Sequence, residues 1–236
     1  MDDSEIERVL CVMAHPDDVD FGLAGTVANW TDAGIKVSYC MITSGDAGGF
    51  DPAVPREQIA GIRELEQRGA AAEVGVSDLR FLGYPDGRLE VSLDLRRDIS
   101  RVIREVRPQR VVCQSPERNW ERIYASHPDH LAAGEATMCA VYPDSRNQFW
   151  FSAELGALEA WTVSEVWVTA AAKANHYVDV TKQFERKVAA LLQHQSQIAS
   201  EETLRDLLKG WLGGNAIAAG MPEGTYAEGF WVMNTL

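Results

Sequence analysis

Hydrophobic residues along this chain gather in short continuous runs that alternate with longer amphipathic stretches. A continuous apolar run of strand length is typical of a strand buried on both faces of a parallel sheet, and the amphipathic stretches have the period of helices. The expected strands are residues 8–14, 36–43, 79–82 and 110–114, and the expected helices are residues 19–33, 56–74, 93–106 and 128–141. This alternation predicts a doubly wound, mostly parallel, Rossmann-like α/β sheet.

The pattern is less regular after about residue 143. We expect strands at residues 165–169 and 177–180 and a helix from residue 181 to about residue 200. Residues 210–236 hold many glycines and aromatic side chains, which fits a lid, an oligomer contact or a packed irregular segment. We therefore expect a single domain over residues 1–236, with a core at 8–142 and an irregular C-terminal extension at 143–236.

Composition and charge narrow the class of partner. The 236 residues are 46% hydrophobic and 24% charged, as in ordinary soluble domains, and the formal net charge is −13. Nucleic acids and anionic membranes need a basic surface, so a small neutral or cationic substrate fits better. No apolar run approaches the roughly 18 to 20 residues of a membrane span, and the acidic start does not resemble a secretion signal, so we expect a cytoplasmic protein.

The tripeptide His-Pro-Asp occurs twice, each time between an expected strand and an expected helix. The copies are His15-Pro16-Asp17, followed by Asp18, and His127-Pro128-Asp129, followed by His130. Ligands of open α/β sheets bind beyond the carboxyl ends of the strands, so the two segments are expected to meet there. Proline favours the first helical position and makes the preceding residue extended. We therefore expect Asp17 and Asp18 to enter a first helical turn, with an analogous arrangement in the second copy.

These side chains suit a catalytic metal site. His15 and Asp18, three residues apart, can turn toward one point, and a histidine from the second copy completes two imidazoles and a carboxylate. Three protein ligands with an open fourth position are typical of catalytic zinc. The spacing alone does not choose between His127 and His130 as the third ligand. Asp17 would then be free to take a proton from a metal-activated water, and the remaining histidine would hold a charge or donate a proton.

Three other functions compete with hydrolysis. Nucleotide binding needs glycines directly after the first strand, where this chain has His-Pro-Asp-Asp. A non-haem iron oxygenase also uses two histidines and a carboxylate, although the α/β alternation argues against it by analogy of fold. A metal-binding scaffold without catalysis has no need of a reactive Asp17.

The motifs and their order resemble the LmbE-like or PIG-L family of zinc-dependent N-acetylglucosaminyl deacetylases, which includes enzymes of mycothiol and bacillithiol assembly. The resemblance is carried by Ala14-His15-Pro16-Asp17-Asp18, Thr43-Ser44-Gly45, Arg63-Glu64-Leu65-Glu66, Leu82-Gly83-Tyr84-Pro85-Asp86-Gly87 and His127-Pro128-Asp129-His130. It covers residues 8–142 well and is weaker beyond them. Leu65 interrupts a run of acidic residues that is common in the family.

The resemblance implies a role for each matching residue. Zinc would be bound by His15, Asp18 and His130, with Asp17 as general base, His127 as acid or electrostatic stabiliser, and Arg63 and Asp86 as substrate-binding or site-positioning residues. Family members that use a tyrosine for the oxyanion have it just before the second motif, whereas Tyr124 lies three residues before His127. We expect His176 to be structural or to line the pocket, and His194 to have no special role.

The expected reaction is hydrolysis of an N-acyl group, chiefly acetyl, from a small-molecule amino sugar or amino-sugar conjugate. The alternative is an amidase that acts on a non-sugar or thiol-conjugate amide. The family and the tryptophan-rich C-terminal segment also lead us to expect a homo-oligomer.

Overall fold

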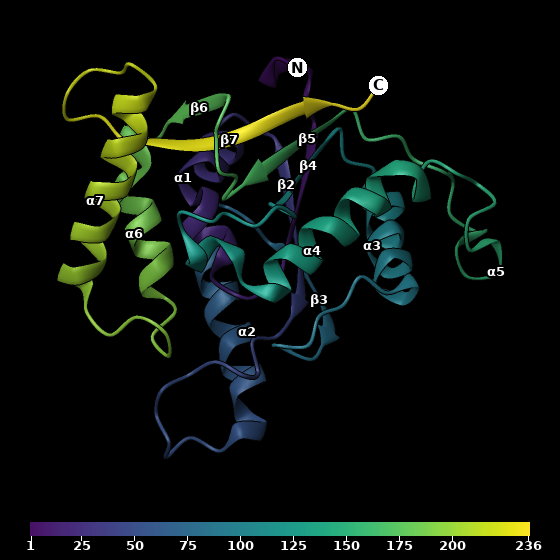
Figure 1. Cartoon of the computed structure of the whole chain (residues 1–236), viewed down its shortest axis with the longest axis horizontal. Coiled ribbons are helices and arrows are strands. Elements are labelled where there is room, and N and C mark those ends of the chain that lie inside the picture. Colours follow the sequence, from purple (N-terminus) through teal and green to yellow (C-terminus); the bar gives the residue numbers. More distant parts are fainter.

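The computed structural model describes residues 1–236 and contains one seven-stranded sheet of order β3-β2-β1-β4-β5-β7-β6 (Figure 1). Five strands are parallel: β1 (Arg8–Met13), β2 (Lys36–Thr43), β3 (Asp78–Tyr84), β4 (Arg110–Gln114) and β5 (Glu165–Thr169). The strand β7 (Ala227–Asn234) is antiparallel to both β5 and β6 (His176–Asp179). The predicted doubly wound α/β class is confirmed.

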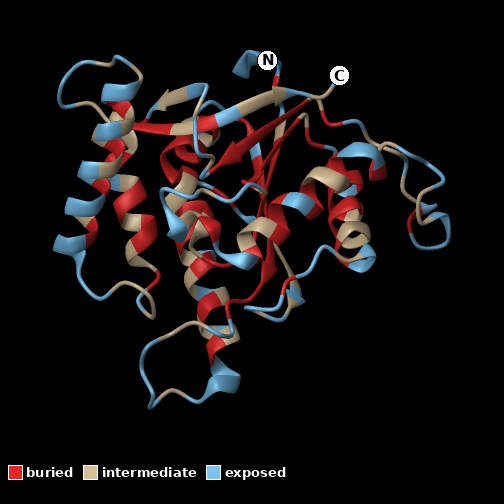
Figure 2. Cartoon of the chain, in the orientation of Figure 1, coloured by how far each residue is buried: buried red, intermediate tan, exposed pale blue.

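Helices cover both faces of this sheet. The helices on one face are α1 (Asp18–Asp32), α2 (Arg56–Glu73) and α6 (Phe184–Leu192), and those on the other are α3 (Leu93–Val106) and α4 (Pro128–Cys139). The central strands are buried except at Arg8, the first residue of β1 (Figure 2), as expected for apolar runs between two helical layers. The remaining helical segments are α5 (Ser152–Leu155), α7 (Glu201–Ala218), a π-helical turn at Ala140–Asp144, and 3-10 turns at Asp3–Glu5, Ile123–Ser126 and Thr181–Gln183.

The C-terminal part is more regular than the sequence predicts. The helix expected over residues 181–200 is the shorter α6, and a second helix, α7, follows it and packs against it (Figure 1). Residues 227–234 form β7, which lies inside the sheet between β5 and β6. Glycine has low intrinsic propensity for helices and strands. The glycines of this segment therefore prevented both elements from being predicted from the sequence.

The strand order places the two His-Pro-Asp segments side by side. The chain runs outward from β1 to β2 and β3 on one side, and β4 then pairs with the opposite edge of β1. Such a reversal opens a crevice beyond the carboxyl ends of the two central strands. The first motif directly follows β1, and the loop that leads to the second follows β4. No helix in the structure combines the length and the apolar character needed to cross a bilayer.

Candidate metal centre

The two His-Pro-Asp copies enter their helices differently. Asp17 lies outside α1 with a φ of 86°, and the helix begins at Asp18. In the second copy Pro128 is itself the first residue of α4, as its fixed φ favours, and the His127 ring caps the helix. The expectation that Asp17 enters the helical turn, and that the two copies match, was therefore wrong. A left-handed aspartate is strained, so other contacts must hold it.

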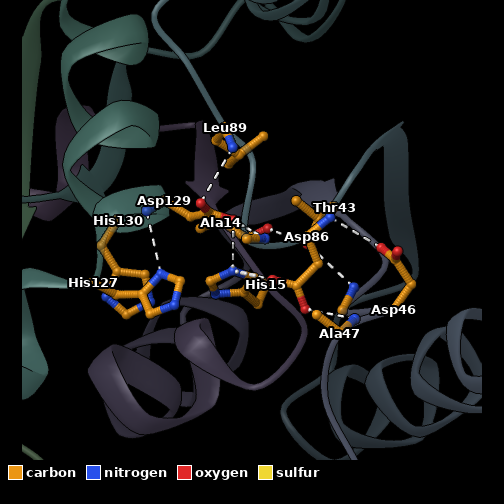
Figure 3. Close-up of polar contacts among 12 residues, drawn as sticks. Ala14, His15, Thr43, Asp46, Ala47, Asp86, Leu89, His127, Asp129 and His130 are labelled. Carbon is orange, nitrogen blue, oxygen red and sulfur yellow. Dashed lines mark hydrogen bonds and ion pairs between the residues drawn. The ribbon is translucent and has the colours of Figure 1, made fainter.

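His15 lies at the centre of the cluster. Its Nε2 is 3.0 Å from Asp86 Oδ1 and 3.2 Å from Asp129 Oδ2, while its Nδ1 is 3.3 Å from Asp18 Oδ2. Figure 3 shows the imidazole between the His127 and His130 rings on one side and Asp86 on the other. Burial alone would lower the pKa of His15, but hydrogen bonds to Asp129, Asp18 and Asp86 raise it to about 12. The surroundings therefore stabilise positive charge at this position.

Asp18 joins the two motifs. One carboxylate oxygen faces His15, and the other lies 3.1 Å from His130 Nε2. Burial would raise the pKa of Asp18, but His130 and His15 together hold it well below its usual range. The His127 ring completes the group, with its centroid 5.0 Å from that of His15 and 5.2 Å from that of His130.

Two overlapping sets of side chains have the spacing of metal ligands: the three histidines of the motifs, and His15 with Asp86 and Asp129. Each carboxylate of the second set accepts at least one hydrogen bond from a backbone N–H. Asp129 accepts from Gly87 and Leu89 N–H at 2.7 and 3.2 Å, and Asp86 accepts from Ala47 N–H at 3.1 Å. The side of His15 that faces Asp18 and His130 therefore fits a zinc-type cation, and Asp86 and Asp129 fit the carboxylates that commonly orient a ligating histidine from behind.

Asp17 is fixed beside this group by residues of α2. Its backbone N–H donates to Gln67 Oε1 at 2.8 Å, and Arg63 Nη2 donates to its Oδ2 at 2.9 Å. Arg63 also donates to the carbonyls of Pro16 and Gly45, and a Cβ on Gly45 would clash with the guanidinium. Burial raises the pKa of Asp17, and Arg63 opposes this rise. These contacts hold the strained carboxylate in one orientation.

The structure thus brings all seven predicted site residues to one edge of the sheet. Arg63 is 4% exposed, so its contacts make it a positioning residue, whereas a direct contact of Arg63 or Asp86 with substrate stays a prediction. Tyr124 is 87% exposed and lines a cavity beside His130. His176 lies in β6, where its ring packs on Trp167, as a structural histidine would.

Sequence reasoning missed a buried chain of contacts behind Asp17. Gln67 donates to Asp20 Oδ2 at 2.9 Å, and His194 Nε2 lies 2.8 Å from the same oxygen. All three side chains are fully buried. His194, for which the sequence predicts no special role, therefore connects the segment after α6 to the base of the site. A lone histidine within a helical pattern carries no signal of such a contact.

Comparison with known proteins gives four consistent findings. The family model "PIG-L: GlcNAc-PI de-N-acetylase" matches residues 10–141. A diacetylchitobiose deacetylase of Thermococcus kodakarensis is 33% identical over 96% of this chain and 83% of its own length. A probable N-acetyl-α-D-glucosaminyl L-malate deacetylase 2 of Bacillus anthracis is 32% identical over 83% of this chain and 84% of its own. The solved N,N'-diacetylchitobiose deacetylase of Pyrococcus horikoshii superposes with a TM-score of 0.89 at 29% identity, over 98% of this chain and 85% of its own.

Proposed function

Because this chain belongs to the PIG-L family of de-N-acetylases, we propose that it is a zinc-dependent hydrolase that removes the acetyl group from an N-acetylated amino sugar or its conjugate. The observation that carries the proposal is the contact of Asp18 with both His15 and His130, beside a separately anchored Asp17. Two imidazoles and a carboxylate leave one position open for substrate, as catalytic zinc sites do.

We assign the metal to His15, Asp18 and His130. A bound zinc ion supplies Lewis-acid polarisation of the amide carbonyl and makes nearby water acidic enough to lose a proton at neutral pH. The chain supplies a carboxylate that balances the cation's charge and, through Asp86 and Asp129, acceptors that fix the His15 ring from its far side.

Asp17 takes the proton from the attacking water and returns it to the nitrogen as the C–N bond breaks, so that the products are the amine and acetate. It is bound to Arg63 and so stays beside the metal ligands without being one of them. Asp17 makes no side-chain cap to the helix that begins at Asp18, and its carboxylate contacts Arg63 of α2 instead. Positioned general bases of this kind contribute roughly 10²- to 10⁴-fold to rate.

His127 donates a hydrogen bond to the oxygen on which negative charge develops. Its Nδ1 accepts the backbone N–H of Asp129 at 3.2 Å, so the neutral ring carries its proton on Nε2. Burial together with His15 and His130 lowers the pKa of His127, which favours this neutral donor over a cationic acid. The residue is exposed, so a substrate can reach it.

Asp129 is expected to control metal affinity without touching the metal. Replacing it by Asn keeps its size but removes the charge behind His15, so the zinc dissociation constant should rise roughly 10- to 100-fold. A competition titration with a chromophoric chelator measures this directly. The matched control is Asp206→Asn, an exposed aspartate of α7, which should bind zinc like the wild type. Equal zinc affinity in Asp129→Asn and wild type would show that Asp129 does not affect metal binding.

The proposed function is tested by measuring acetate release from a panel of N-acetylated compounds, with metal content determined on the same sample. We expect release from N-acetylglucosamine or a conjugate of it. Release only from a non-sugar or thiol-conjugate amide would favour the alternative amidase. No release from any amide by protein that holds about one zinc per chain would refute the proposal.

Three further expectations remain predictions of the sequence: a single domain, assembly into a homo-oligomer, and a cytoplasmic location. The first is supported by strands from both halves of the chain sharing one sheet. Exposed aromatic residues such as Phe149, 86% exposed, are compatible with an assembly.

A further inference from the structure

The helix α1, which begins at Asp18, is kinked near its start. Leu23 interrupts it with a φ of −155° and a ψ of 17°, far from helical values. Besides proline, which α1 lacks, a common cause of such a kink is a side chain that inserts between the backbone groups of the helix. The break separates a first segment, residues 18–22, from the rest of α1.

Lys187 of α6 bonds the carbonyl side of this break. Its Nζ donates to the backbone oxygens of Asp20 and Phe21 at 2.8 and 2.6 Å. Its side chain is fully buried, and α6 packs beside α1 (Figure 1). In an unbroken helix these oxygens would accept from backbone N–H groups one turn further along the chain. The lysine ammonium is inserted at this point instead.

Glu228 of β7 bonds the other side of the break. Its Oε1 accepts the N–H of Gly25 at 3.1 Å, and its Oε2 accepts that of Thr26 at 2.7 Å. The same carboxylate accepts a hydrogen bond from Lys187 Nζ at 2.6 Å, so the two charges form one buried ion pair. In an unbroken helix the Gly25 N–H would donate to the Phe21 carbonyl. Here those two groups are bonded to opposite members of the pair.

Stability alone does not account for this arrangement. An unbroken helix satisfies the same backbone groups without burying any charge, and apolar residues in place of a buried ion pair are often neutral or stabilising. What the break changes is the direction of the first segment, which begins at Asp18. The same segment carries Asp20, whose carboxylate bonds the Gln67 amide that holds Asp17. Both Asp17 and Asp18 therefore depend on how this segment is held.

We propose that Lys187 and Glu228 are positioning residues, which hold the first segment of α1 in the direction that the metal ligand Asp18 and the base Asp17 require. The inference rests on the proposed function, which assigns those two roles. It gives α6 and β7 a part in the metal centre, although neither supplies any of its seven predicted residues.

The first test replaces both charges, as Lys187→Met combined with Glu228→Gln. This double variant leaves no unpaired buried charge and does not alter the net charge of the chain. The zinc dissociation constant, measured by competition with a chromophoric chelator, should rise roughly 10-fold, because Asp18 no longer meets His15 and His130 in the same geometry. With saturating zinc, kcat for acetate release should fall roughly 10- to 100-fold while KM stays within about twofold.

The matched control removes a buried ion pair at the opposite edge of the sheet. Arg110 and Glu165 have side chains 0% and 3% exposed and are the first residues of β4 and β5, whereas the metal centre lies beyond the carboxyl ends of the strands. Arg110→Met combined with Glu165→Gln should lower the melting temperature, as the first double variant should, but it should bind zinc and turn over like the wild type.

A milder variant keeps the test decisive if the first double variant does not fold. Glu228→Asp retains both charges and shortens the acceptor by one methylene, so it should fold and should weaken zinc binding in the same direction, by less.

The positioning role is refuted if the folded variants of the pair bind zinc and turn over no differently from the control, since Lys187 and Glu228 would then serve stability alone. That result leaves the proposed function intact. Wild-type protein that binds zinc but releases no acetate from any amide would refute the proposed function instead, and the zinc affinities would still decide whether the pair positions Asp18.

Discussion

Replacing Asp17 by Asn is expected to leave the metal in place and to lower kcat for deacetylation roughly 10²- to 10⁴-fold. The amide cannot accept the proton of the attacking water, yet it keeps the size of the side chain and an oxygen for the hydrogen bond from Arg63. The backbone bond from Asp17 to Gln67 is unaffected by the change, so the left-handed turn should persist. Steady-state kinetics and metal analysis on one sample measure both effects.

The control for this substitution is again Asp206→Asn, which makes the same chemical change at an exposed position and should retain wild-type kinetics. Loss of metal from Asp17→Asn would contradict the assigned roles, since it would make Asp17 a ligand. Near-wild-type activity with metal bound would assign the base to another group.

The position of the site could be predicted from the sequence because the motifs and apolar runs that indicate it are local patterns. Continuous apolar runs fix the buried strands, and His-Pro-Asp follows them at the carboxyl edge of the sheet. Val9 to Met13 are buried as that pattern requires, and His15 comes two residues after the strand ends. The histidines and aspartates among the seven candidate residues meet at one edge for this reason, whereas Arg63 reaches them from α2.

The unpredicted part of the site depends on contacts across long stretches of sequence. Asp129 shares the repeated tripeptide with Asp17, yet its carboxylate points to the back of His15, because α4 begins at Pro128 whereas α1 begins at Asp18. Likewise, nothing near His194 reveals that it will meet Asp20, 174 positions away. Tertiary packing determines such contacts. The helix α7 was not predicted for a different reason, since its glycines lower the helix propensity of the segment.

The neighbouring substitution, Asp18→Asn, is expected to have the opposite effect from Asp17→Asn on metal binding. Asp18 contacts His15 and His130 with different oxygens, and its negative charge balances the cation. An Asn can still accept the backbone N–H of His15, which Asp18 receives at 2.7 Å, so the fold should survive. The variant should therefore be purified without metal and with activity at background, as wild-type protein should be after treatment with a chelator.

Adding metal back to chelated protein distinguishes zinc-dependent hydrolysis from iron-dependent oxygenation and from hydrolysis without a metal. Zinc should restore wild-type activity after chelation, with oxygen present or absent, and should fail to restore Asp18→Asn. Melting temperature should rise with zinc in the wild type and stay constant in Asp18→Asn, because only a ligand that binds the native state stabilises it. Restoration that requires ferrous iron and oxygen would instead indicate the oxygenase chemistry that two histidines and a carboxylate also support. Full activity in chelated protein would mean that hydrolysis proceeds without the metal, and the pairing of Asp18 with the two histidines would then be structural.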